Sequence, residues 1–100
     1  MVGRTAGFDI IYVYAAHDLP LPMHFLQRRR NQRTDEYGGT LANRCRYPLE
    51  VFAAVRQAYS GCLGLRLSAT DWVEGGWDLA QSTEFCQQLK AAGCDFIHVS

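Results

Sequence analysis

Three short apolar runs, separated by longer amphipathic segments, set the pattern of this sequence. The runs cover residues 10–14, 63–67 and 96–99. β-Branched and aromatic residues dominate the first and third runs, as is typical of strands in a largely buried sheet. We therefore predict three strands with helical segments between them.

The segment between the second and third runs is predicted to be a helix. Asp78 stands where an N-cap residue is expected, and Gly93 is placed to end the helix in the left-handed conformation. Five apolar residues recur at helical spacing between them: Leu79, Phe85, Cys86, Leu89 and Ala92. A strand, a helix and a strand with short connections form a βαβ unit, which implies a parallel sheet and a right-handed crossover.

A second helix is predicted before residues 63–67, with Thr40 as its N-cap. One face is marked by four residues at helical spacing: Tyr47, Val51, Val55 and Tyr59. Pro48 removes a backbone donor and crowds the preceding turn. We therefore expect a short turn, a kink near Pro48, and then a regular helix to about Tyr59 that Gly61 closes.

The spacing of the runs predicts the fold class. Leu63 and Phe96 are 33 residues apart, and a (β/α)8 barrel of ~250 residues allots about 31 residues to each unit. The first unit is longer than this norm by roughly 20 residues. Its surplus, residues 18–39, is expected to form a loop over the carboxyl ends of the strands.

Three parallel strands cannot close a barrel that needs eight. Parallel strands also need both faces covered, and two edges of this sheet would stay open. The sequence therefore predicts an α/β fold in which residues 1–100 are an internal fragment of a (β/α)8 TIM barrel domain. A doubly wound open sheet is the alternative.

Composition and charge narrow the possible partners. The 100 residues include 10 basic and 10 acidic side chains, so the formal net charge is zero. This balance gives no electrostatic reason to expect binding to nucleic acid or to an anionic membrane. No apolar run approaches the ~20 residues of a membrane span, and the first residues lack the apolar core of a signal peptide, so a cytoplasmic location is expected.

The four cysteines, Cys45, Cys62, Cys86 and Cys94, fit no zinc or cluster spacing. We expect them to be reduced residues that pack in the core, and we expect no metal site.

The first strand presents candidate chemistry at its carboxyl end. Because side chains alternate along a strand, Ile11 and Val13 suit the layer against the helices, and Tyr12 and Tyr14 then point into the barrel. Tyr14 lies nearest the carboxyl end, and His17 follows just beyond it. A phenol and an imidazole at a barrel mouth could bind a small substrate or move a proton. The structural alternative is that Tyr14 packs and His17 forms hydrogen bonds within the loop.

Arg66 interrupts the otherwise apolar second strand. A permanent cation inside a barrel needs a carboxylate partner or an anionic ligand, so Arg66 is either a ligand contact or half of a structural ion pair. His98, alone in the third strand, is expected to be a core residue. The run Arg28-Arg29-Arg30 is typical of a solvated surface, with contact to an acidic substrate or partner as the alternative.

Several sequence blocks carry a resemblance to a known family. The longest is Asn-Gln-Arg-Thr-Asp-Glu-Tyr-Gly-Gly-Thr at residues 31–40, followed by Asn43-Arg44. Further blocks occur at residues 6–9, 15–17, 65–69 and 91–93. Together they resemble the old yellow enzyme family of FMN-dependent NADH:flavin oxidoreductases. The resemblance implies a (β/α)8 barrel that holds FMN at its carboxyl face, with this chain similar to about the fourth to sixth strands.

The resemblance also implies roles for the site residues. Arg66 matches the arginine beside the pyrimidine edge of the flavin. His17 matches the second member of a His-x-x-His or His-x-x-Asn pair over the flavin, and Tyr14 stands where the first His is common. The Tyr-x-x-His pattern is similar to the trimethylamine and dimethylamine dehydrogenase and N-demethylase branch. Leu19 stands where ene-reductases place a proton-donating Tyr, whereas residues 46–51 and 71–76 resemble the reductases.

The implied function is that of a fragment of an FMN-dependent oxidoreductase. Hydride would pass through FMN between NADH, NADPH or an amine and a small organic acceptor, and any iron–sulfur cluster would lie outside this segment. The implied partners are a small-molecule substrate and the remainder of the barrel or another chain. The alternative is a non-catalytic half-barrel that only associates with other chains.

Overall fold

The computed structural model describes residues 9–16, 21–28, 30–70, 72 and 76–100. Along these residues the elements are β1 (Ile10–Ala15), α2 (Leu21–Leu26), α3 (Leu41–Ala58), β2 (Cys62–Leu67), α4 (Leu79–Ala91) and β3 (Phe96–Val99). The strands form one sheet in the order β1-β2-β3, and both pairings are parallel. The three predicted parallel strands and the intervening helices are therefore confirmed.

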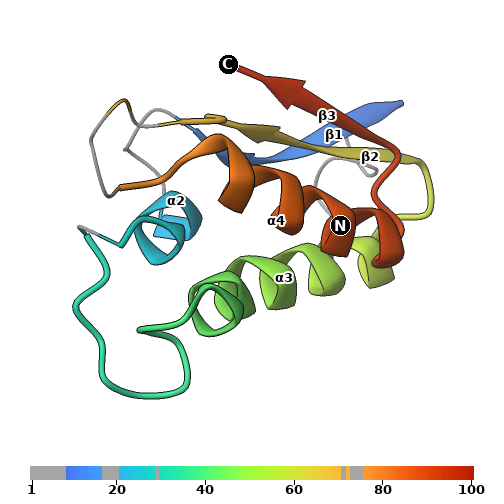
Figure 1. Cartoon of the computed structure of the whole chain (residues 1–100). Coiled ribbons are helices and arrows are strands. Elements are labelled where there is room, and N and C mark those ends of the chain that lie inside the picture. The colour runs from blue at the N-terminus through green and yellow to red at the C-terminus, as the bar shows by residue number, and fades with distance from the viewer. Residues whose placement is uncertain (1–8, 17–20, 29, 71, 73–75) are drawn as a thin grey trace.

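The sheet has one covered face and one open face (Figure 1). The helices all lie on the same side of it. Leu63, Leu65 and Leu67 of β2 point to that side and are fully buried or nearly so, which agrees with the alternation of side chains along a strand. The opposite side, called the open sheet face below, carries the side chains of Tyr12, Tyr14, Arg66, Phe96 and His98, with Gly64 between them.

Gly64 leaves room on the open sheet face for an aromatic side chain of β3. A Cβ atom at this position would overlap the ring of Phe96, its register partner on β3. A glycine inside a strand often marks such a close approach. The missing side chain therefore lets the Phe96 ring lie flat across β2.

Both ends of α4 form as predicted. The carboxylate of Asp78 accepts a hydrogen bond from the backbone N–H of Gln81 at 2.9 Å. Gly93 has a φ of +95°, in the left-handed region that glycine adopts at little cost. These two residues fix the length of the crossover helix and thereby the position of β3.

The prediction for α3 is right at its start, but the short turn expected before Pro48 is instead part of the helix. The hydroxyl of Thr40 caps the helix by accepting from the N–H of Asn43, but a single helix then continues through Pro48 to Ala58. Proline inside a helix costs about 3 kcal/mol or more. Pro48 is fully buried in this helix, so its packing offsets part of that cost.

The far end and the buried face of α3 also differ from the expectation. The helix ends at Ala58, and Tyr59, not Gly61, is the C-cap. The phenol of Tyr59 donates to the carbonyl of Asp9 at 2.7 Å, which ties the helix end to the start of β1. The most buried line on the helix runs through Cys45, Pro48 and Phe52, one position away from the predicted face.

The long segment after β1 is partly helical, which the sequence pattern did not predict. Leu21–Leu26 forms α2, and its Met23 and Leu26 join the core. In Figure 1 the chain after α2 runs beside the N-terminal end of α3, on the helix side of the sheet. This part of residues 18–39 therefore lies at the end of the sheet where β2 finishes, as expected for a segment at the carboxyl ends of the strands, but it is partly helical and lies on the helix side.

Candidate functional site

Arg66 and Tyr14 lie next to each other on the open sheet face. They are direct register partners in the β1–β2 pairing. The guanidinium carbon of Arg66 is 5.8 Å from the centre of the Tyr14 ring, within the range of a cation–π interaction. The structure thus brings together two of the three residues singled out by the sequence. The third, His17, lies outside the described residues.

Hydrogen bonds among the described residues satisfy the guanidinium of Arg66 only in part. One of its terminal nitrogens donates to the hydroxyl of Ser100 at 3.0 Å. Its Nε is buried and has no hydrogen-bond partner among the described residues. A buried donor without an acceptor costs roughly 1–3 kcal/mol, so an acceptor placed beside this nitrogen would be favoured.

His98 completes the row formed by Tyr14 and Arg66. It is the register partner of Arg66 on β3, and its ring meets Tyr12 edge-on at 6.2 Å. The side chain is exposed on the open sheet face, so the expectation of a buried core histidine is wrong. A phenol, a guanidinium and an imidazole therefore stand side by side across the three strands.

The block at residues 31–40 is held by its own hydrogen bonds. Arg33 pairs with the carboxylate of Asp35 through two nitrogens, and the N–H of Tyr37 donates to the same carboxylate. The hydrogen bond from Arg33 and that from Tyr37 lower the pKa of Asp35. Arg33, Asp35 and Tyr37 therefore form a local network of hydrogen bonds. The phenol of Tyr37 also donates to Glu50 of α3 at 2.7 Å.

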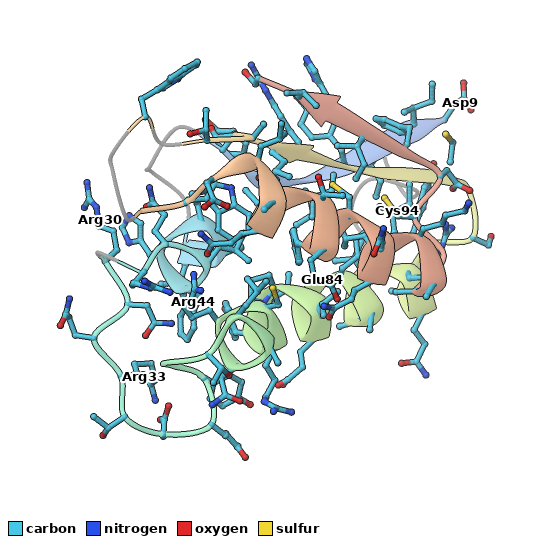
Figure 2. All side chains as sticks on the ribbon, viewed as in Figure 1. Asp9, Arg30, Arg33, Arg44, Glu84 and Cys94 are labelled. Atoms are coloured by element: carbon cyan, nitrogen blue, oxygen red, sulfur yellow. The ribbon has the colours of Figure 1, made fainter. Side chains whose placement is uncertain are left out.

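Arg44 is a buried residue whose role the sequence reading missed. Its side chain donates to the carbonyls of Leu26 and Gly39 at 2.7 and 3.2 Å and to the side-chain oxygen of Gln81 at 2.8 Å. Burial lowers the pKa of this guanidinium, and repulsion from Arg28 lowers it further. In Figure 2 Arg44 lies between α2 and α3, away from the open sheet face. We assign it to the packing of the helices.

The described residues contain no cluster of His, Cys, Asp or Glu that could hold a metal ion. All four cysteines are free thiols. Cys45 is buried, whereas Cys62 is exposed, which contradicts the expectation that every cysteine packs in the core. Among the described helices, none has the length and apolar character needed to cross a membrane.

These features define a segment of a parallel α/β barrel with a cation and a phenol on its inner face. The chain belongs to the NADH:flavin oxidoreductase / NADH oxidase family, whose model matches residues 2–100. It is 41% identical over 97 residues to the NADPH dehydrogenase of Bacillus subtilis (strain 168), and this covers 97% of the chain but 28% of that protein.

Solved structures of other proteins are also similar to this chain. Morphinone reductase in complex with tetrahydroNAD is 36% identical, with a TM-score of 0.83 over 97% of this chain and 28% of its own length. Histamine dehydrogenase from Rhizobium sp. 4-9 is 38% identical, with a TM-score of 0.77 over 86% of this chain and 13% of its own. The predicted family and the predicted partial (β/α)8 barrel are therefore confirmed. The chain spans less than a third of the relatives it matches.

Proposed function

We propose that the protein to which this segment belongs is an FMN-dependent oxidoreductase. In this proposal Arg66 contacts the cofactor, Tyr14 and His17 contact the substrate, and residues 1–100 are an internal part of the FMN-binding barrel. The observation that carries the proposal is the buried Nε of Arg66, which has no acceptor among the described residues and stands beside Tyr14 on the open sheet face. Family membership supports the choice of flavin.

The residues on the open sheet face fit a flavin. Bound FMN would supply reversible acceptance of a hydride, with negative charge developing on its ring when reduced. A guanidinium is permanently charged and can stabilise such a charge without changing its own protonation. Tyr14 could orient a small substrate or move a proton at its phenol oxygen. The 5.8 Å separation keeps its ring close to this cation.

The reductant in the proposal is a reduced nicotinamide, because several relatives are NADPH dehydrogenases. An amine is the second candidate donor, favoured by Tyr14 and by the likeness to a histamine dehydrogenase. Reduced nicotinamides are cytoplasmic metabolites, so we also expect a cytoplasmic location. The partners are then a small substrate and the strands that complete the barrel.

The decisive experiment uses the full-length protein purified with its flavin. We expect bound FMN, and we expect its absorbance to bleach anaerobically on addition of NADPH or of a small alkylamine; the donor that bleaches it assigns the branch. Tyr14→Phe should slow the substrate half-reaction by about 10²-fold, as loss of a proton-transferring group does, while FMN occupancy is unchanged. Absence of flavin from the purified protein would overturn the proposal.

Arg66→Gln tests the cofactor contact. Loss of one charge-assisted hydrogen bond, about 1.5–3 kcal/mol, should weaken FMN binding at least tenfold, measured by quenching of FMN fluorescence. Arg66→Lys keeps the charge but loses the planar fork, so its affinity for FMN should lie between that of the unchanged protein and that of Arg66→Gln. Lys90→Gln removes an exposed cation from α4 and should bind FMN as the unchanged protein does.

A further inference from the structure

Arg66 has a long and flexible side chain, so its neighbours determine the direction of its guanidinium. Side chains alternate along β2, and Arg66 therefore points to the open sheet face, whereas Leu65 and Leu67 are buried on the helix side. An arginine loses much rotamer freedom when it is held in one orientation. The contacts that hold the guanidinium therefore decide how well it meets a ligand.

Groups from both sides of β2 contact the guanidinium of Arg66. The ring of Tyr14 on β1 lies 5.8 Å from the guanidinium carbon. The hydroxyl of Ser100, which directly follows β3, accepts a hydrogen bond from a terminal nitrogen at 3.0 Å. A ring face attracts a cation without selecting one of its nitrogens, whereas a hydrogen bond joins two particular atoms. Ser100 therefore fixes which nitrogen of Arg66 stays on the β3 side.

The position of Ser100 is itself set by the sheet. Its backbone N–H donates to the carbonyl of Leu67 at 2.9 Å, which extends the hydrogen bonding between β2 and the chain that follows β3. Leu67 directly follows Arg66, so the backbone and the side chain of Ser100 are tied to two adjacent residues of β2. A group that is held in this way costs little reorganisation when charge develops beside it.

The hydrogen bond to Ser100 leaves other donors of Arg66 for a ligand. The Nε of Arg66 has no hydrogen-bond partner among the described residues. Because the guanidinium is planar and moves as one group, a hydrogen bond at one nitrogen also fixes the directions of the remaining N–H groups. His98 lies on the same face two residues before Ser100, but its ring meets Tyr12. The contact from the β3 side to Arg66 is thus made by Ser100.

We propose that Ser100 is a positioning residue for the cofactor contact, and that its hydroxyl holds the guanidinium of Arg66 in the orientation that stabilises negative charge on the reduced flavin. This inference rests on the proposed function, because it concerns the same site. Ser100 acts through Arg66 and need not touch the flavin. Since the negative charge develops on reduction, loss of the hydroxyl should weaken the binding of reduced FMN more than that of oxidised FMN.

The test is the reduction potential of FMN bound to the full-length protein, measured anaerobically against a reference dye. We expect Ser100→Ala to decrease the preference for reduced over oxidised FMN about tenfold, the value of one hydrogen bond to a charged group. This change lowers the potential of a two-electron couple by about 30 mV. Ser100→Thr keeps a hydroxyl and should stay within about threefold of the unchanged protein.

Ser82→Ala is the matched control. It removes a hydroxyl of α4 that donates to the carbonyl of Ala69, and Ser82 is buried. We expect the potential of bound FMN to be unchanged in this variant, because the hydroxyl of Ser82 makes its contact away from Arg66.

A second measurement shows whether Ser100 acts through Arg66. The full-length protein stripped of its flavin is titrated with oxidised and with reduced FMN, so that a variant with weak binding can still be measured. In an Arg66→Met background no guanidinium is left to orient, and Ser100→Ala should leave the ratio of the two dissociation constants unchanged. An equal effect of Ser100→Ala with and without Arg66 would overturn the inference, because the hydroxyl would then act on the flavin directly.

The outcomes separate this inference from the proposed function. Flavin content is read first, and a protein purified without flavin overturns both. A flavoprotein whose potential does not change in Ser100→Ala, or falls equally in Ser82→Ala, keeps the proposed function and overturns the role of Ser100. If circular dichroism shows that Ser100→Ala has lost its fold, Ser100→Cys is measured in its place, since a thiol accepts hydrogen bonds only weakly.

Discussion

Arg44 is a single buried side chain that connects three segments of the fold. Its guanidinium joins the end of α2, the loop before α3 and the start of α4. Arg44→Met removes these donors and leaves three oxygens without them, so we expect a loss of about 2–4 kcal/mol in the free energy of unfolding. The measurement is urea denaturation of the protein that contains this segment. Arg28→Ala, at an exposed site, should change stability by less than about 0.5 kcal/mol, and equal effects of the two changes would contradict this role.

The four cysteines should differ in their reactivity toward alkylating reagents. Burial raises the pKa of Cys45 to about 11, and burial also raises the pKa values of Cys86 and Cys94. Only the thiolate reacts with alkylating reagents, so at pH 8 about one Cys45 thiol in a thousand is reactive. We expect exposed Cys62 to be alkylated first, as read by mass spectrometry of the peptides. Labelling of Cys45 before Cys62 in the folded protein would contradict the structure.

At the scale of elements, the sequence correctly predicted the features that depend only on neighbouring residues, such as the helix caps. Asp78, Gly93 and Thr40 act as caps because a cap depends on a few neighbouring residues. The short turn expected before Pro48 was wrong because tertiary burial, which a local pattern does not contain, keeps these residues in α3. Likewise, α2 has six residues, too few for a periodic pattern, and it is held by packing on the core.

The loop of residues 31–40 provides a prediction of pH dependence. The partners of Asp35 lower its pKa in the folded protein, so their stabilising effect is present above the unfolded value of about 3.9 and is lost as the pH falls through the lower folded value. We expect hydrogen exchange at the amide of Tyr37, corrected for its intrinsic pH dependence, to lose protection below about pH 4. Asp35→Asn should show weak protection at every pH. Protection equal to that of the unchanged protein would show that this carboxylate does not order the loop.

At the scale of the whole molecule, the site was predictable only in part. The side-chain alternation along β1 and β2 placed Tyr14 and Arg66 on one face, and the parallel pairing of these strands made them neighbours. Arg44 was missed because an arginine on an amphipathic helix usually faces water, and only the packing of α2 and α4 around it reveals its burial.

The open sheet face leads to a prediction about the 100-residue chain by itself. Tyr12 and Tyr14 on this face are 46% and 37% exposed, and β1 and β3 each have a single pairing partner in the described sheet. Flavin sites in this fold draw on several strands, and the phosphate site usually comes from the loops after strands seven and eight. Arg66 alone offers one charged contact. The binding free energy from that contact is small compared with the free-energy cost of ordering an incomplete site. Unpaired parallel edges also favour association between copies.

We therefore expect the isolated chain to self-associate in light scattering coupled to gel filtration, and to quench added FMN fluorescence only at concentrations well above micromolar. The full-length protein stripped of its flavin and titrated in parallel is the control for an intact site. A second control is the isolated chain carrying Arg66→Gln, which should titrate like the unsubstituted chain if neither forms a site. Stoichiometric binding of FMN by a monomer at micromolar concentration or below, abolished by Arg66→Gln, would mean that three strands suffice to hold the cofactor and that the remaining barrel is dispensable for binding.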